Sequence, residues 1–260
     1  MPNDATDGRT DTETTDVLVV GGGVGGLTAG IFTARAGLDT LVVRAGESIL
    51  RRNAHLENYP GFPAGVNPRT LLDMTEAQAE RAGCTVREGT VTAVTEVERG
   101  DGEEHEAGFD VSLDGESVRT RFVVVATKND TGFLADLPDL GIVTRGSKTY
   151  VDADWEGRTE VDGLYAAGRV AEQPHQTVVA AGHGATVGLA VVEDSDVPYY
   201  HDWTATEGYF TGRGREVPPG CEEIDDEERE RRERESMEAM REYFAEPHPD
   251  PPTPHPSQEE

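Results

Sequence analysis

The sequence predicts an α/β fold, in which a parallel sheet carries helices on its faces and is extended by a β-meander. Two apolar runs, 16–20 and 40–43, are typical of buried parallel strands, and residues 24–36 between them have the pattern of a helix. A strand, a helix and a second strand in this order form one βαβ unit. Further strand patterns, which form the meander and a return strand, lie at 90–98, 109–113 and 118–127.

The turn after the first strand carries the spacing GxGxxG. Gly21 permits a tight turn, Gly23 lets the backbone approach a pyrophosphate, and Gly26 lets the following helix pack against the strand. The N-terminus of that helix would direct its amides and its positive dipole end at the phosphates. We therefore expect a Rossmann-like dinucleotide-binding unit. The alternative is a glycine-rich turn that serves packing alone.

The region after the second strand combines a loop, a helix and a short strand. Prolines and glycines exclude regular structure from residues 45–66. Asn67 and Pro68 have the residue types of a helix cap and a first helical residue, and Gly83 is typical of the helix end. We expect a short strand at 84–87.

The chain has no room for a second nucleotide domain after the return strand. About 35 residues separate Thr127 from Gly163, whereas a separate domain needs on the order of 100. We expect a disordered N-terminus at 1–15 and a cofactor-binding domain at 16–193. The domain would contain two binding segments, 16–128 and 149–193, joined by a short linker. An acidic extension at 194–260 would follow, with one helix near 225–244 and a flexible Pro-rich end.

The composition restricts the possible partners and the compartment. The formal net charge is −28, and Lys128 and Lys148 are the only two lysines. Such an acidic surface argues against nucleic acid and anionic membranes as partners, because both are polyanions. It suits concentrated salt, which screens repulsion among carboxylates. With no apolar stretch long enough to span a bilayer and no signal peptide, we expect a halophilic cytoplasmic protein.

The two cysteines, Cys84 and Cys221, lie far apart and form no CxxC motif. A disulfide framework, a dithiol relay and a zinc site are therefore not expected, and no metal is predicted. Cys84 has the pattern of a buried small hydrophobic residue. Cys221 follows Pro-Pro-Gly in a loop and is a weak redox candidate.

Five motifs follow one another between residues 16 and 193. They are GGGVGG after the first strand, LENYPG at 56–61, the strand end FVVVAT, GLYAAG at 163–168, and HQTVVAAGHGATVGLA at 175–190. In this order and spacing they resemble the thioredoxin reductase branch of the two-dinucleotide-binding flavoprotein family. The resemblance implies FAD as the cofactor. In that family two FAD-binding segments flank an inserted NADPH domain, which is absent here.

The resemblance also implies which residues contact the cofactor. The LENYPG loop would lie near the isoalloxazine, with Asn58 as a polar contact, and Gly168 would allow close approach to the diphosphate and ribityl chain. The helix that begins near Gln176 and Thr177 would point its N-terminus at the pyrimidine end of the flavin. There its amides would stabilise negative charge on the reduced cofactor.

Several positions expected to line the cofactor depart from the family pattern. Thr127 is followed by Lys128 where the family usually has glycine, and Arg169 replaces the aspartate of Gly-Asp. Arg44 stands where many relatives carry an acidic ribose ligand, a role that Glu47 could take instead. We hypothesise that the three cations neutralise the diphosphate or an extra phosphate. The alternative is that they point into solvent and pair with surface carboxylates.

Two histidines flank the expected start of the flavin-facing helix. Histidine titrates near neutral pH, so His175 or His183 could donate a proton to reduced flavin or to substrate. His175 is the preferred catalytic candidate. The alternative for both is a structural or capping role.

Two function classes remain open. The first is an FAD-dependent oxidoreductase that passes electrons between an external donor and an unknown acceptor, since it lacks the nicotinamide domain and CxxC of the thioredoxin reductase route. The second is a degenerate relative that binds FAD or a nucleotide in a regulatory or structural role. A nicotinamide dehydrogenase with one Rossmann unit is a distant third. The family resemblance suggests a homodimer.

Overall fold

The computed structural model describes residues 12–97, 108–199 and 201–254, and these form an α/β fold around one central sheet. The sheet has seven strands in the order β3-β2-β1-β6-β5-β4, with β9 also paired to β6. This confirms the predicted fold class. The strands are β1 (Glu13–Val20), β2 (Thr40–Arg44), β3 (Thr85–Glu88), β4 (Val91–Val97), β5 (Gly108–Leu113), β6 (Glu116–Val125) and β9 (Leu164–Ala166).

The strand β6 joins the parallel part of the sheet to the meander. Along its first half it pairs antiparallel with β5, and at Val123–Val125 it pairs parallel with β9. On its other side β6 runs parallel to β1 along almost its whole length. The carboxyl ends of β1, β2, β6 and β9 therefore meet at one edge of the sheet.

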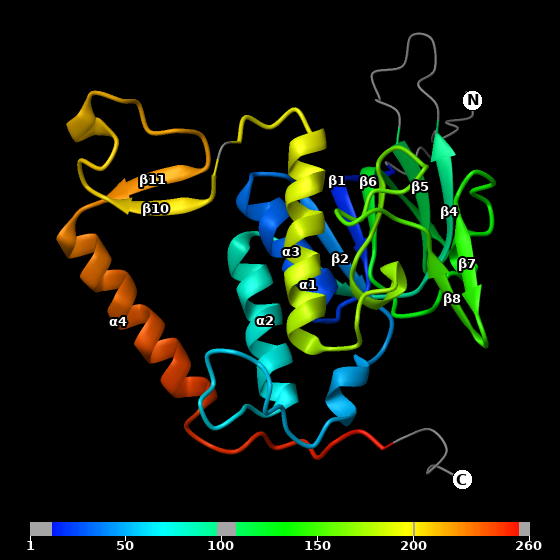
Figure 1. Cartoon of the computed structure of the whole chain (residues 1–260), viewed down its shortest axis with the longest axis horizontal. Helices are drawn as coiled ribbons and strands as arrows, with labels where there is room; N and C mark the ends of the chain where they lie inside the picture. Colours follow the sequence, from blue (N-terminus) through cyan, green and yellow to red (C-terminus); the bar gives the residue numbers. More distant parts are fainter. Residues whose placement is uncertain (1–11, 98–107, 200, 255–260) are drawn as a thin grey trace, which may run out of the picture.

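The helices α1 (Val24–Arg35), α2 (Pro68–Ala82) and α3 (Thr177–Asp194) lie together on one side of the parallel strands (Figure 1). Alternate residues of each strand face them, since successive side chains point to opposite faces. Val17 and Val19 pack with α1 and α3, whereas Leu18 and Val20 pack with the meander and with the short 3₁₀ helix η2 (Gly132–Leu134).

The ends of α2 follow the sequence prediction. Asn67 Oδ1 accepts a hydrogen bond from Arg69 N at 2.9 Å, and Pro68 is the first helical residue. The helix ends at Gly83, whose φ of 111° is in the left-handed region that glycine adopts without strain.

Glycines allow α1 and α3 to pack with their backbones in contact. A β-carbon at Gly184 would collide with the carbonyl oxygen of Gly25, and one at Gly188 would lie 2.7 Å from Ala29 O. Side chains at these positions would force the two helices apart.

Two small sheets and a fourth helix complete the described chain. An antiparallel hairpin begins with β7 (Ile142–Arg145) in the expected linker and continues with β8 (Lys148–Val151) into the expected second binding segment. In the C-terminal extension, β10 (Trp203–Thr206) and β11 (Cys221–Ile224) pair in parallel, and α4 (Asp226–Tyr243) follows. The extension thus contains a small sheet and the short 3₁₀ helix η4 (Thr211–Arg213) besides the one helix expected from the sequence.

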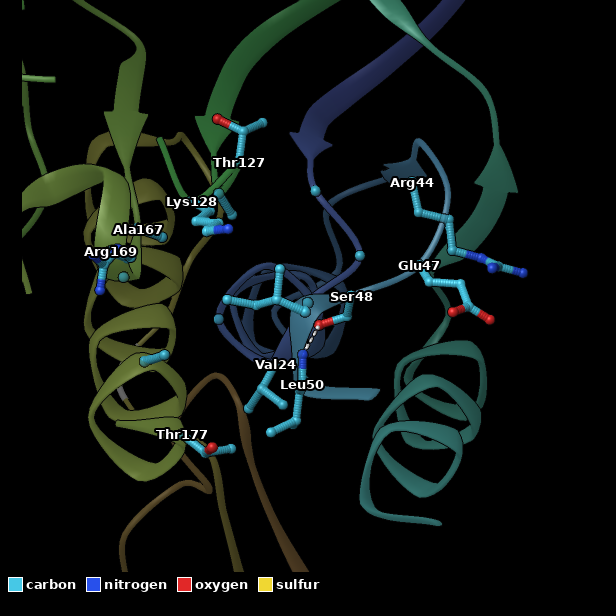
Figure 2. A pocket seen from close by; sticks show the side chains of 18 of the residues that line it. Val24, Arg44, Glu47, Ser48, Leu50, Thr127, Lys128, Ala167, Arg169 and Thr177 are labelled. Atoms are coloured by element: carbon cyan, nitrogen blue, oxygen red, sulfur yellow. Dashed lines mark hydrogen bonds between the residues drawn. The ribbon is translucent and has the colours of Figure 1, made fainter. Parts of the chain in front are cut away.

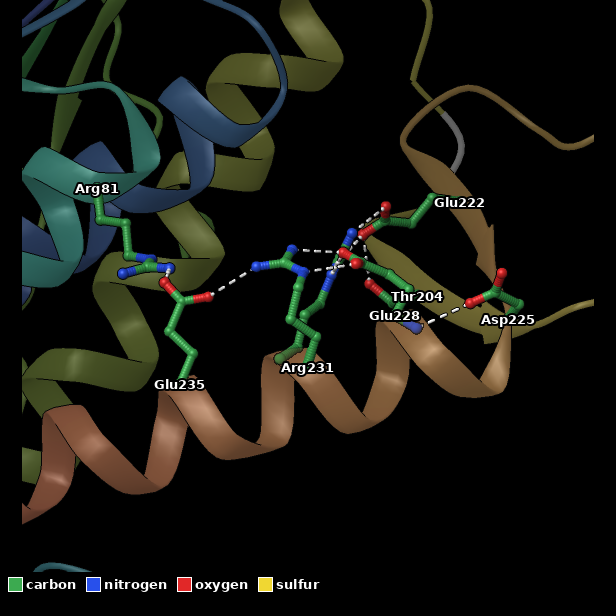
Figure 3. A network of polar contacts seen from close by, with 8 residues as sticks. Arg81, Thr204, Glu222, Asp225, Glu228, Arg231 and Glu235 are labelled. Carbon is green, nitrogen blue, oxygen red and sulfur yellow. Dashed lines mark hydrogen bonds and ion pairs between the residues drawn. The ribbon is translucent and has the colours of Figure 1, made fainter.

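Ion pairs connect α4 to the neighbouring elements (Figure 3). Arg232 donates to Glu222 on β11, and Glu235 pairs with Arg81 on α2. Asp225 caps the helix by accepting a hydrogen bond from Glu228 N at 2.8 Å. These partners are mostly solvent-exposed, so each pair contributes little to stability on its own.

Three expectations need correction. β1 begins at Glu13, inside the segment 1–15 that was predicted to be disordered, because residues 13–15 pair with β6. The rest of that prediction, for residues 1–11, lies outside the described residues. The loop 45–66 contains a 3₁₀ helix, η1 (Ile49–Arg52), whose first turn is capped by Ser48. The Pro-rich end, predicted to be flexible, packs on the body as far as Thr253.

The packed C-terminal end makes several specific contacts. Phe244 lies with its ring centroid 6.2 Å from that of Phe62. The side chain of His248 is 8% exposed, and its Nε2 lies 2.9 Å from a carboxylate oxygen of Asp73 on α2. These contacts bring the end of the chain beside η1.

None of the helices in the described residues has the length and apolar character that a membrane span requires.

We predict opposite effects for alanine at two glycines of α3. Gly184→Ala should destabilise the fold by about 1–3 kcal/mol, because its β-carbon meets the backbone of α1. Gly182→Ala is the matched control: no atom lies within 4 Å of its β-carbon, and alanine favours a helix. Thermal unfolding of both variants checks this, and equal melting temperatures would contradict it.

Candidate functional site

A cavity of about 810 Å³ opens at the edge of the sheet where the parallel strands end. This volume is within the usual range of small-molecule sites, and the position is the usual one for ligands in open α/β sheets. The predicted site residues that line it are Gly21, Gly23, Arg44, Glu47, Asn58, Thr127, Lys128, Gly168, Arg169, His175, Gln176 and Thr177.

The glycine-rich turn forms one wall of the cavity. Gly21 has a φ of 125°, and a β-carbon there would lie 2.5 Å from Ala126 O. The nearest atom to a β-carbon at Gly23 is Ser48 Oγ at 3.6 Å, so the backbone of Gly23 is open toward the cavity. Gly26 does not line the cavity: its missing side chain lets α1 pack against Gly21 and Ala126. The three glycines therefore occupy positions suited to the roles expected of them.

Two helix N-termini meet the cavity. Gly23 precedes α1 and Gln176 precedes α3, and neither receives a side-chain cap from the described residues. The first amides of each helix therefore lack intrahelical partners, and the positive ends of both dipoles lie at the cavity. Val24, Gly25 and Thr177 of the two first turns are part of its lining. This arrangement favours a ligand that carries negative charge at two places.

Asn58 and Gln176 are bonded to one another. Asn58 Nδ2 donates to Gln176 Oε1 at 2.8 Å, across 118 residues of sequence. The contact joins the LENYPG loop to the start of α3. Both side chains border the cavity, so the two segments expected near the isoalloxazine are brought together.

His183 positions the segment that follows β9. This residue of α3 is buried, and its Nδ1 accepts a hydrogen bond from Gly168 N at 2.9 Å. Burial lowers the pKa of His183, because the desolvated ring favours its neutral form. His183 does not line the cavity. The proton-donor alternative is thus less suitable for His183 than the structural role.

His175 is exposed at the rim of the cavity. Partial burial lowers its pKa, and the positive charges of Arg169, Lys128 and Lys148 lower it further. The ring is therefore mainly neutral at pH 7, and the protonated form accumulates only in acid.

The three cations expected at the cofactor separate into two groups (Figure 2). Arg44 and Glu47 lie on one wall, and Lys128 and Arg169 lie near each other on another. Arg44 NH2 is 3.7 Å from a carboxylate oxygen of Glu76 on α2. Arg44 therefore has a carboxylate within ion-pair distance, as the surface-pair alternative requires, although it also borders the cavity.

Glu47 already has partners in the structure. The hydroxyl of Thr253 donates to its carboxylate at 2.6 Å, and Arg51 Nε lies 3.5 Å away. The Thr253 hydrogen bond lowers the pKa of Glu47, and Arg51 adds to the shift. A role as ribose ligand would require Glu47 to accept a further hydrogen bond, for which a carboxylate has capacity.

Arg69, which the sequence pattern did not single out, supports the lining loop. This residue of α2 is 3% exposed, and its NH1 donates to the carbonyl oxygens of Arg51 and Asn53 at 3.0 Å each. It thereby fixes the end of η1. A basic residue at the second position of a predicted helix is otherwise unremarkable, so no local signal distinguishes it.

Neither cysteine offers a thiolate at the cavity. Cys84 is buried, and burial raises its pKa to about 11, as expected of a buried small residue. Cys221 Sγ donates to His201 O at 3.2 Å in the C-terminal extension. Both thiols are absent from the cavity lining.

We predict that His183 contributes to acid-sensitive stability. His183→Ala should lower the free energy of unfolding at pH 8 by about 1–3 kcal/mol, because Gly168 N loses its acceptor. His183→Asn, whose side-chain oxygen can accept that bond, should lose less.

The pH dependence follows from the lowered pKa. The stability from neutral His183 is complete above the unfolded pKa of about 6.5 and is lost as pH falls through the lower folded pKa. In denaturant titrations, the free energy of unfolding should therefore fall less between pH 8 and pH 5 in both variants than in the parent. Parallel curves for parent and variants would contradict the assignment.

Comparisons with known proteins point to one family. Residues 16–54 match the family model described as FAD binding domain. Thioredoxin reductase of Streptomyces coelicolor is 40% identical over 83 residues, and that of Listeria monocytogenes is 32% identical over 114 residues. The matches cover 30% and 43% of this chain but only 26% and 33% of those relatives. The chain thus spans a third or less of their length.

Solved structures support the same fold. A thioredoxin reductase from Gloeobacter violaceus superposes with a TM-score of 0.60 at 17% identity, over 70% of this chain and 96% of that chain. That of Lactococcus lactis gives a TM-score of 0.60 at 14% identity, over 69% and 98%.

The residues of the cavity fit FAD as a cofactor. The glycine cradle, where β-carbons at Gly21 and Gly26 would collide with backbone, leaves space beside the uncapped start of α1 for a diphosphate. The second uncapped helix start lies at the same cavity, next to the Asn58–Gln176 pair. With the match to an FAD binding domain over residues 16–54 and the shared fold, these features make the chain similar to the FAD-binding part of thioredoxin reductases.

Proposed function

We propose that this protein is an FAD-dependent oxidoreductase that passes electrons between an external donor and a separate acceptor. The observation that carries the proposal is the pair of uncapped helix starts, α1 and α3, at one cavity of suitable size. FAD, when bound, would supply the capacity to take up and release electrons. The relatives that support this activity are matched over part of their length only.

The residues of the cavity would bind and orient the cofactor. The turn Gly21–Gly23 and the amides at the start of α1 would hold the diphosphate, and Gly168 would leave room for the chain beside it. The amides at the start of α3 would stabilise negative charge at the other end of the cavity. The hydrogen bond between Asn58 and Gln176 would keep the LENYPG loop against α3.

The donor and acceptor would both reach the cavity from solvent. The sequence contains no CxxC motif, so this chain has no adjacent dithiol of its own to carry electrons onward. The described part of the chain also has one central Rossmann-like sheet, and the short hairpin β7–β8 follows the first binding segment. Electron donors that fit this arrangement are small reductants or separate redox proteins.

The visible absorption spectrum tests the proposal most directly. We expect protein purified in concentrated KCl, which suits its acidic surface, to show flavin bands that bleach under reductant and return with an acceptor. Gly23→Val places a side chain in the open space before α1. This variant should therefore bind much less flavin than the parent protein. A colourless protein that takes up no added FAD would favour the non-catalytic alternative.

We also propose His175 as a proton donor in the reaction. Because the pKa of His175 is lowered below the usual histidine value, its protonated form accumulates only at more acidic pH. Reoxidation of reduced protein by a quinone, followed in a stopped-flow instrument, should therefore accelerate in acid. In His175→Ala this acceleration should disappear while the flavin content stays the same. Equal pH profiles for parent and variant would remove His175 from the mechanism.

A further inference from the structure

Both lysines of the chain lie in a group of cations that only partly lines the cavity. Lys128 and Arg169 line it, and Lys148 begins β8, the strand that packs beside the 3₁₀ helix η3 (Gly168–Ala171) that carries Arg169. Arg52, on η1, lies close enough to act on the charge of Lys128. We call Arg52, Lys128, Lys148 and Arg169 the basic cluster. In a chain with a net charge of −28, four clustered cations are unexpected.

The basic cluster forms no ion pair with the described residues. The one side-chain hydrogen bond among its members runs from Arg169 Nε to Asn129 Oδ1, a neutral acceptor, at 3.2 Å. Most other arginines of the described chain, by contrast, have a carboxylate partner, such as Asp202 for Arg35 and Asp194 for Arg158. The positive charge of the cluster is therefore uncompensated by an ion pair.

Lys128 is the member of the cluster whose ionisation responds to the neighbouring cations. Partial burial lowers the pKa of Lys128, and the positive charges of Arg52, Arg169 and Lys148 lower it further. Repulsion of this kind disfavours the ligand-free arrangement and is relieved when an anion binds.

The backbone of Lys128 provides an independent observation. Its φ of 68° lies in the left-handed region, which costs energy for a residue with a side chain and favours glycine. The strained residue lies at the cavity wall, on the same side as Arg169 (Figure 2). Strain of this type is commonly retained where it serves a site.

We propose that the basic cluster binds a phosphate group of a ligand held in the cavity. The inference rests on the proposed function for one of its two possible sources, the diphosphate of FAD. The other source is a phosphate of a second ligand, such as the electron donor. Arg44, which has its own carboxylate neighbour on a different wall, takes no part.

Titrations in a fixed concentration of KCl test this and separate the sources. Flavin-free protein is titrated with FAD and with riboflavin, which lacks phosphate, and FAD-loaded protein is titrated with inorganic pyrophosphate. The variants are Lys128→Gly, Lys128→Asn and Arg169→Gln. Arg215→Gln is the control: it removes one positive charge at an exposed residue of the C-terminal extension.

We expect each cluster variant to bind one of the two phosphate ligands, FAD or pyrophosphate, about tenfold more weakly than the parent. The control variant should bind both with unchanged affinity. Weaker FAD binding with unchanged riboflavin binding assigns the cluster to the cofactor, and weaker pyrophosphate binding to loaded protein assigns it to a second ligand. Unchanged affinity for both phosphate ligands overturns the proposal.

Stability gives a second readout that a structural role would not produce. Lys128→Gly should unfold at the same or a higher temperature than the parent, because glycine relieves the positive φ. Asparagine also tolerates this backbone conformation. If the parent takes up no FAD, the proposed function fails, and pyrophosphate titration of the flavin-free protein still tests the cluster: tighter binding by the parent than by the variants supports it, and equal binding overturns it.

Discussion

The cavity depends on backbone segments that approach one another more closely than a β-carbon would allow. Gly21 lies against the backbone of Ala126 at the end of β6, and Gly184 brings α3 onto α1 at Gly25. Both helices begin at the cavity, so their packing sets the separation of the two helix N-termini. The positions at which the site favours negative charge are therefore determined by residues without side chains.

Local signals made most of this architecture predictable. The GxGxxG spacing identifies the first βαβ unit, and the capping residues Asn67 and Gly83 define the ends of α2 within a residue. The missed features depend on partners far away in the sequence. β10 and β11 are short strands that pair with each other, and the Pro-rich end is held by contacts such as that between His248 and Asp73. Composition alone suggests a flexible end, because it does not reveal such partners.

The candidate site was predictable as a set of lining positions, but the roles of individual side chains were not. Arg44, Lys128 and Arg169 look equivalent in sequence, as cations at unusual positions. The structure distinguishes them because α2 brings Glu76 to Arg44, whereas no carboxylate of the described residues lies within ion-pair distance of the other two. His183 likewise looks like a possible acid, and its role at Gly168 depends on the packing of α3. Tertiary neighbours decide these roles.

The acidic surface gives the basic cluster a particular electrostatic meaning. An anionic ligand that approaches this protein meets net repulsion over most of the surface, since the formal charge is −28. The Debye length is about 8 Å at physiological ionic strength and about 3 Å at 1 M salt, so long-range attraction by four cations would be screened. The cluster would therefore act at contact distance, within the cavity, rather than by steering ligands through solvent. Contact binding by a few cations would select a ligand whose phosphate fits beside Lys128 and Arg169, and it would reject anions that cannot enter.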